Sequence, residues 1–426
     1  MDHHPENFRF DSIPDSHDWS DLYDLPFAAP SGSGSIPVID LNDPKLIEKI
    51  GEACEKWGVF LISNHGIEPE LLNQFGNQMH RLFALPIEAK LKVAKTDGYG
   101  AGYGGIPISP HFPKFMWHEG FIITGSPLDH AQKLWPDDYS SFCEVVEEYK
   151  KAINPLGYRL MHAILLSLGL SEEEINHTPI EDSNKISMHL NSYPACPNPD
   201  QAIGMGPHTD SGFLTILYTN GVSGLQVLRH KDDIGPERWV TVLTVPNAFV
   251  VNISDLMHVL SNGRYHNVVH RVIVSRTNQR LSAGYFLRPP IDVKVGPLSK
   301  LTEPEQGLVY RPVTWPELLN MKSMLYDKAL DAIKINGLGS VRDQPSLASF
   351  SVSNPRGSPL APHSIFSRGT IGSFVLQCEE LNPMDGDPNG NLPAVESTGE
   401  EDVALIGPDP TPARQRKKCP LPSAHM

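Results

Sequence analysis

Two histidines and one aspartate have the types and spacing of a metal site. His208 and Asp210 are two residues apart, and such residues point to the same side of an extended chain. Residues 213–218, Phe-Leu-Thr-Ile-Leu-Tyr, favour a strand directly after them. A third ligand must come from another strand, and residues 267–274 predict one that carries His270. Two histidines and one carboxylate suit a non-haem Fe(II) ion, bound on one face with other positions open.

Arg280 and Ser282 follow on the next stretch and are again two residues apart, so the guanidinium and the hydroxyl share a face. An arginine can bind a carboxylate through two parallel charge-assisted hydrogen bonds, and a serine hydroxyl can add a third. The pair therefore predicts a site for a carboxylate close to the metal.

The order His208-Thr209-Asp210, then His270-Arg271-Val272, then Arg280-Leu281-Ser282 resembles the 2-oxoglutarate/Fe(II)-dependent dioxygenases of plants. The resemblance implies His208, Asp210 and His270 as the iron ligands. It also implies that Arg280 and Ser282 bind the distal carboxylate of 2-oxoglutarate, with Arg280 counted among the catalytic residues.

A further match is the segment Leu190–Pro194, which contains the N-x-Y-P pattern of the same family. The resemblance implies that Asn191 and Tyr193 border the 2-oxoglutarate pocket, with the tyrosine hydroxyl reaching the same carboxylate. It further implies O2 as the oxidant, succinate and CO2 as products, and ascorbate as the agent that keeps the iron ferrous.

Other histidines compete for these roles. His230 and Asp232 form a second His-x-Asp, but they lie in a charged run beside Gly235-Pro236 that predicts a solvated hairpin loop. His266 has the same strand parity as His270, and we expect it at the mouth of the strand. A lone His270 would be interpreted as a core histidine; the positions of Asp210, Arg280 and Ser282 favour the ligand instead.

Composition excludes several classes of protein. The net charge of −15 and the pI near 5.6 argue against a nucleic-acid partner, because phosphate binding requires a basic surface. Five scattered cysteines without a C-x-x-C motif indicate neither zinc nor a disulfide framework and fit a reducing compartment. The longest apolar stretch, near residues 163–170, is too short to cross a bilayer. We expect a cytoplasmic protein with no membrane association and no evident protein partner.

The chain is predicted to fold as an α+β, mainly β protein: a double-stranded β-helix (jelly roll) core backed by helices from an N-terminal region. Short strands with turn signals over 183–290 favour a sandwich or jelly roll. Apolar stripes at helical spacing predict helices after Pro44, after Pro69 and over 139–170. The expected regions are a flexible lead-in (1–34), an N-terminal region of helices and strands (35–170), the jelly roll (183–290), a C-terminal closing helix (291–337, helical over 315–335) and a disordered tail (338–426). A basic run at 414–418 is interpreted as solvated charge, with nuclear import as the alternative.

A glycine- and proline-rich loop with aromatic residues spans 98–113. Loops of this kind often carry function when a rigid scaffold positions them. The loop could line the substrate entrance or could simply pack as an ordinary loop, and the sequence leaves both alternatives open. The substrate-pocket candidates are Tyr103, Met116, Trp117 and Phe121.

Residues 20–336 resemble the gibberellin 3-beta-dioxygenases, on segments such as Ile106–Pro110 and Trp117–Phe121. This implies a small, apolar, acidic substrate hydroxylated at C-3. Arg288 departs from the family, which typically has glycine before the two prolines. The alternatives are a gibberellin 20-oxidase or 2-oxidase, another plant dioxygenase such as a flavonoid hydroxylase, or a non-catalytic binding protein with the tail as its interaction arm.

Overall fold

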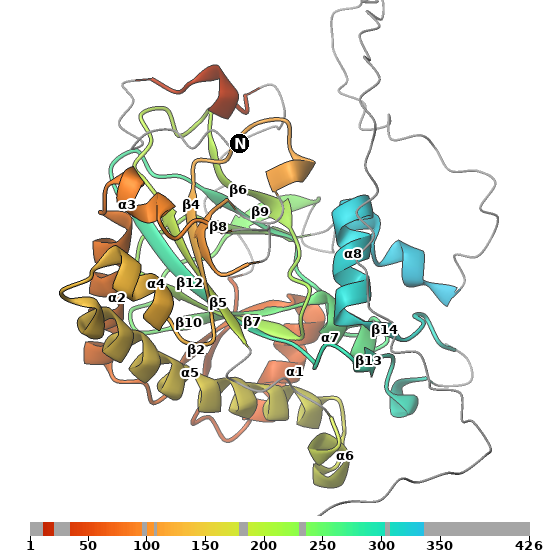
Figure 1. Cartoon of the computed structure of the whole chain (residues 1–426). Coiled ribbons are helices and arrows are strands. Elements are labelled where there is room, and N and C mark those ends of the chain that lie inside the picture. The colour runs from red at the N-terminus through yellow and green to blue at the C-terminus, as the bar shows by residue number, and fades with distance from the viewer. Residues whose placement is uncertain are drawn as a thin grey trace, which may run out of the picture. The chain divides into compact units, whose positions relative to one another are not determined.

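A computed structural model describes residues 12–20, 35–95, 100–105, 109–178, 186–229, 236–302 and 307–335 (Figure 1). The tail predicted over 338–426, the basic run at 414–418 and the second His-x-Asp at His230 and Asp232 lie outside these residues. The boundaries of the predicted regions stay predictions.

Two sheets form the centre of the described chain. The major sheet has eight strands in the order β1-β2-β10-β7-β12-β5-β4-β3, and the minor sheet has four in the order β6-β11-β8-β9. The major-sheet strands are β1 (Val38–Asp40), β2 (Val59–Ser63), β3 (Gly102–Gly104), β4 (Glu119–Thr124), β5 (Ser187–Tyr193), β7 (Leu214–Thr219), β10 (Phe249–Ile253) and β12 (Arg280–Leu287). The minor-sheet strands are β6 (Ile203–His208), β8 (Leu225–Arg229), β9 (Arg238–Thr241) and β11 (His270–Ile273).

From β5 to β12 the chain passes back and forth between the two sheets: β5, β7, β10 and β12 lie in the major sheet, and β6, β8, β9 and β11 in the minor one. This alternation is that of a double-stranded β-helix, so the predicted fold class is confirmed. The strands of the N-terminal region, β1 to β4, pair with the major sheet and extend it. That region therefore shares the core of the jelly roll.

The helices predicted from apolar spacing are present. They are α1 (Leu46–Lys56), α2 (Pro69–Phe83) and α5 (Tyr139–Ser167), joined by the shorter α3 (Ile87–Leu91), α4 (Leu128–Leu134), α6 (Glu172–Asn176) and α7 (Asp255–Leu260). Helix α5 packs against α1, α2 and α4 and continues through Pro155. Phe75 of α2 stacks on Tyr149 of α5 with ring centroids 3.9 Å apart, inside the main apolar core. Among the described residues, no helix has both the length and the apolar content for a bilayer crossing.

Two expectations differ from the structure. The lead-in was expected to be loosely ordered, yet Trp19 is fully buried and donates a 2.8 Å hydrogen bond from Nε1 to the Phe115 carbonyl. The closing helix was expected over 315–335, but α8 ends at Leu325 (Trp315–Leu325). Tyr326 has a φ of 49°, a left-handed conformation that ends a helix, and two 3-10 turns follow (Tyr326–Lys328 and Asp331–Ile333). Helix α8 follows the short strand β14 (Val313–Thr314), which pairs with β13 (Lys294–Val295).

Candidate metal centre and carboxylate pocket

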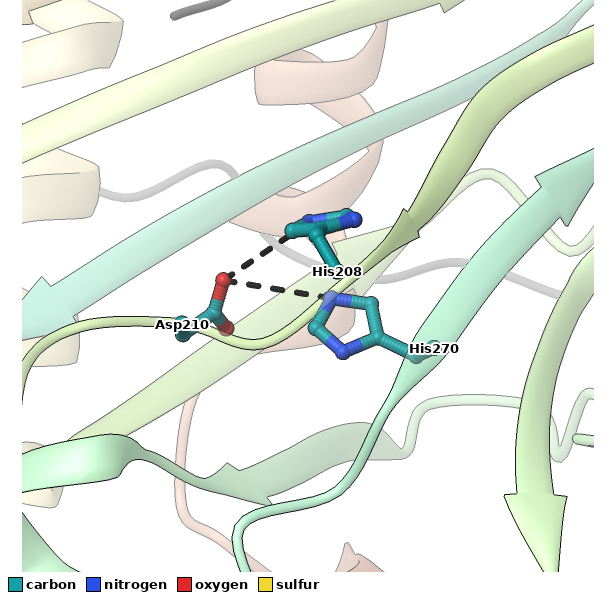
Figure 2. Close-up of side chains that lie close together, drawn as sticks. All are labelled: His208, Asp210 and His270. Atoms are coloured by element: carbon teal, nitrogen blue, oxygen red, sulfur yellow. Dashed lines mark ion pairs between the residues drawn. The ribbon is translucent and has the colours of Figure 1, made fainter. Parts of the chain in front are cut away.

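The structure brings the three predicted metal ligands together. His208 ends β6 and His270 begins β11, and the two residues are direct partners across this antiparallel pair. Asp210 lies just beyond β6, with Oδ1 3.9 Å from His208 Nε2 and 3.8 Å from His270 Nε2. Figure 2 shows all three side chains pointing toward one another. One ligand atom from each lies within 4.8 Å of the others, as binding to a common ion requires.

Backbone carbonyls hold both imidazoles in the tautomer that leaves Nε2 free to bind a metal. Nδ1 of His208 lies 2.8 Å from the Gly206 carbonyl oxygen, and Nδ1 of His270 lies 3.1 Å from that of Val268. A carbonyl oxygen only accepts hydrogen bonds, so each Nδ1 carries the proton. The Nε2 lone pairs therefore face Asp210, and a hydrogen bond of this kind is the usual support of a metal-binding histidine.

The pKa shifts of His208 and Asp210 also favour metal binding. Burial lowers the pKa of His208 to about 3, with His270 acting in the same direction, so the His208 imidazole is neutral near pH 7. Burial by itself would raise the pKa of Asp210, but the neighbouring histidines and a 2.6 Å hydrogen bond from Thr215 Oγ1 to Oδ2 lower it. The site thus offers imidazole nitrogens and one carboxylate, the donor set that suits Fe(II).

Beside this centre lies a buried cation. Arg280, at the start of β12, is 2% exposed, and its Nε and Nη1 have no hydrogen-bond partner. Its guanidinium lies 5.1 Å from the ring centroid of Tyr193, the cross-strand neighbour on β5. Burial raises the pKa of Tyr193 although Arg280 and Ser282 oppose the shift. Unpaired buried donors are costly, so this corner fits a ligand carboxylate, as the distal carboxylate of 2-oxoglutarate would supply.

One cavity of about 200 Å³ joins the two features. Alternate residues of β12 and β5 line it, because side chains two apart share a strand face. The β12 residues on its wall are Arg280, Ser282, Gly284 and Phe286, with Arg288 just beyond the strand, and those of β5 are Ser187, His189, Asn191 and Tyr193. All seven residues predicted for the metal and the carboxylate, namely His208, Asp210, His270, Arg280, Ser282, Tyr193 and Asn191, line this cavity.

The four substrate-pocket candidates are not brought to the cavity wall. Tyr103 and Phe121 pack in the main apolar core, where Tyr103 donates a 2.6 Å hydrogen bond to Glu119 Oε1. Met116 and Trp117 belong to a second core cluster. Pairing of β3 and β4 with the major sheet places Tyr103 and Phe121 in this core, and all four positions correspond to ordinary packing.

Helix α8 supplies much of the wall that sequence reasoning missed. Its cavity-lining residues are Trp315, Leu319 and Lys322, and Tyr326 follows at the helix end. They are spaced by four, three and four residues, which places them on one helix face. That spacing was visible in the sequence, as was the parity that puts Phe286 and Arg288 on the face of Arg280. His118 was also missed; its Nε2 donates to Asn191 Oδ1 at 2.9 Å and orients that amide.

Comparisons with known proteins agree with this geometry. The model of the 2OG-Fe(II) oxygenase superfamily matches residues 185–289, and that of the N-terminal region of non-haem dioxygenase in morphine synthesis matches residues 36–138. Gibberellin 3-beta-dioxygenase 1 of Pisum sativum is 42% identical over 352 residues, which cover 80% of this chain and 93% of that protein. Gibberellin 3-beta-dioxygenase 1 of Arabidopsis thaliana is 43% identical, with 78% and 93% covered.

Solved structures show the same fold. The crystal structure of JOX2 in complex with 2OG, Fe and JA aligns with a TM-score of 0.59 at 31% identity and covers 73% of this chain and 90% of that one. The rice dioxygenase for auxin oxidation aligns with a TM-score of 0.59 at 28% identity and covers 70% of this chain and 100% of the other.

Proposed function

Because the chain belongs to the 2OG-Fe(II) oxygenase superfamily, we propose that it hydroxylates a gibberellin at C-3. Fe(II) and 2-oxoglutarate are its metal and its cosubstrate. In this reaction O2 oxidises both molecules: 2-oxoglutarate becomes succinate and CO2, and one C–H bond of the substrate becomes C–OH. Ascorbate as the agent that keeps the iron ferrous, and a cytoplasmic location, stay predictions.

We assign the iron to His208, Asp210 and His270, and the distal carboxylate of 2-oxoglutarate to Arg280, Ser282 and Tyr193. Iron bound there supplies the activation of O2. The observation that carries the assignment is the convergence of three ligand atoms within 4.8 Å in the cavity that also contains a buried arginine with unpaired donors. The carbonyls of Gly206 and Val268 hold the imidazole protons on Nδ1 and leave Nε2 for the metal.

The rest of the cavity suits an apolar acid. Phe286, Leu319 and Trp315 present apolar surface. Arg288 directly follows β12 on the cavity side, eight residues from Arg280, with its guanidinium 4.3 Å from the Trp315 ring centroid. Along a strand, eight residues span about 26 Å, so the two arginines mark separate parts of the wall. We propose that Arg288 binds the carboxylate of the gibberellin, while Arg280 binds the cosubstrate.

The function is tested with the purified full chain, Fe(II), 2-oxoglutarate and ascorbate, offered a panel of gibberellins and flavonoids. Mass spectrometry then identifies the products. A 3-hydroxylated gibberellin supports the proposal. Oxidation at C-2 or C-20, or hydroxylation of a flavonoid alone, would assign the chain to one of the alternative dioxygenase activities. An iron-binding chain that releases no CO2 from 2-oxoglutarate would overturn the enzymatic proposal and favour a binding protein.

A further inference from the structure

The segment that carries two of the proposed ligands also contacts helix α8, which lines the same cavity. His208 and Asp210 face the centre, whereas the odd-numbered residues between and around them contact helix α8 and Tyr326. The Tyr326 hydroxyl donates to the Pro207 carbonyl, Lys322 Nζ donates to the carbonyl and the hydroxyl of Thr209 (2.8 Å each), and Trp315 Nε1 donates to Ser211 Oγ (3.0 Å). Each odd-numbered residue from 207 to 211 is therefore bonded from this side.

Lys322 also forms a buried ion pair with Asp255. Its Nζ lies 2.5 Å from Asp255 Oδ2, and the two side chains are 13% and 2% exposed. The two acceptors of Thr209 and this carboxylate match the three donors of an ammonium group. Because every donor has an acceptor, the geometry of Lys322 is fixed in three directions.

Asp255 connects this lysine to both ligand segments. Its backbone N–H donates to the Asp210 carbonyl at 2.9 Å. Its other carboxylate oxygen, Oδ1, accepts from Asn267 Nδ2 at 2.8 Å, three residues before His270. The path from Lys322 through Asp255 thus reaches the segment of His208 and Asp210 on one side and the approach to His270 on the other.

We propose that Lys322 is a positioning residue of the metal centre: together with Asp255 it fixes the ligand segments and thereby sets the metal affinity. Functional geometry must hold to within about 0.5 Å, which only a rigid supporting shell provides. Loss of such supporting contacts typically weakens metal binding about 10- to 100-fold. Lys322 lies outside the ligand set, and its hydrogen bonds go to Thr209 and Asp255. The inference rests on the proposed iron site.

The test measures binding of Co(II) alone to the full chain, followed by its visible d–d absorption, so that no turnover is needed. Lys322→Met should weaken Co(II) binding about 10- to 100-fold and change the shape of the d–d spectrum. Lys322→Arg, which keeps the charge, should recover part of the affinity. Lys328→Met is the matched control, because the Lys328 side chain is 65% exposed and its ion pair is with the neighbouring Asp327; Co(II) binding by this variant should equal that of the wild type.

Lys322→Met leaves Asp255 as a buried carboxylate without its cation, which can impair folding. Tyr326→Phe serves as the second variant, since it removes a single hydroxyl contact to the same segment. It should fold with an unchanged melting temperature and still alter the d–d spectrum. If a variant that folds shows the wild-type d–d spectrum and a Co(II) affinity within twofold of the wild-type value, the positioning role is overturned. Failure of the wild-type chain to bind Co(II), with His208→Ala giving the same result, would instead overturn the metal site itself.

Discussion

Replacement of Arg280 by leucine should change ligand binding and stability in opposite directions. The guanidinium is 2% exposed, and its Nε and Nη1 have no hydrogen-bond partner. Burial lowers the pKa of Arg280, which means that the interior disfavours its charged form. The arginine therefore destabilises the ligand-free chain and recovers this energy when a carboxylate binds. Leucine removes both the cost and the binding interaction.

The magnitudes follow from the two unpaired donors. Hydrogen bonds to charged groups are worth about 1.5–3 kcal/mol each, so two amount to about 3–6 kcal/mol. At about 1.4 kcal/mol per factor of ten, the Kd for 2-oxoglutarate should rise about 10²- to 10⁴-fold. Replacement of buried charged groups by apolar ones is often neutral or stabilising, by about 1–4 kcal/mol. The ligand-free variant should thus unfold at the wild-type temperature or above it.

Calorimetric titration of 2-oxoglutarate into the Co(II)-loaded chain measures the first effect, and thermal unfolding with and without 2-oxoglutarate measures the second. The stabilisation by ligand, which follows RT ln(1 + [L]/Kd), should disappear in the variant. Arg276→Leu is the matched control, because Arg276 is exposed and precedes Arg280 by four residues. A Kd for Arg280→Leu within threefold of the wild-type value would refute the carboxylate assignment.

Substitution of His208, Asp210 or His270 by alanine should abolish CO2 release from labelled 2-oxoglutarate, since two remaining donors cannot hold the metal; release at the wild-type rate contradicts the ligand assignment. Arg288→Leu should raise the KM for the gibberellin about 10- to 100-fold, the value of one lost charged hydrogen bond; steady-state kinetics that show an equal rise in the KM for 2-oxoglutarate would reject the separate roles. Burial lowers the pKa of His17 to about 4, below the unfolded value of about 6.5. The buried neutral imidazole therefore costs no unfolding free energy above pH 6.5, and it reduces the unfolding free energy as the pH falls toward 4. His17→Phe should reduce the loss of unfolding free energy over this range by up to about 3 kcal/mol, and denaturant titrations with identical pH dependence in both proteins would exclude this cause.

Strand parity explains why the candidate site could be found from the sequence. His208 and Asp210, like Arg280 and Ser282, are two residues apart, and the side-chain period of a strand is two in any fold. The same local rule places Asn191 and Tyr193 on one face of β5, and all six line the cavity. Helical spacing located α1, α2 and α5 in the same way, because the period of 3.6 residues is also a property of the local backbone.

What the sequence left undecided depends on contacts between distant segments. Apolar residues near a glycine-rich loop can line a pocket or fill a core, and only the pairing of β3 and β4 with the major sheet decided that Tyr103 and Phe121 are core residues. The end of α8 at Tyr326 was equally unmarked, since no glycine or proline stands there.

The residue types, their order and their parity thus determined by themselves that two imidazoles, a carboxylate and a guanidinium are spaced for one shared site. Only the tertiary structure decided that helix α8 closes the other side of the ligand segment. Lys322 lies 67 residues from Asp255 and 113 from Thr209, and no local periodicity relates positions so far apart. Their contact results from packing of the whole domain, because a buried ammonium is stable only where folding has collected enough acceptors around it.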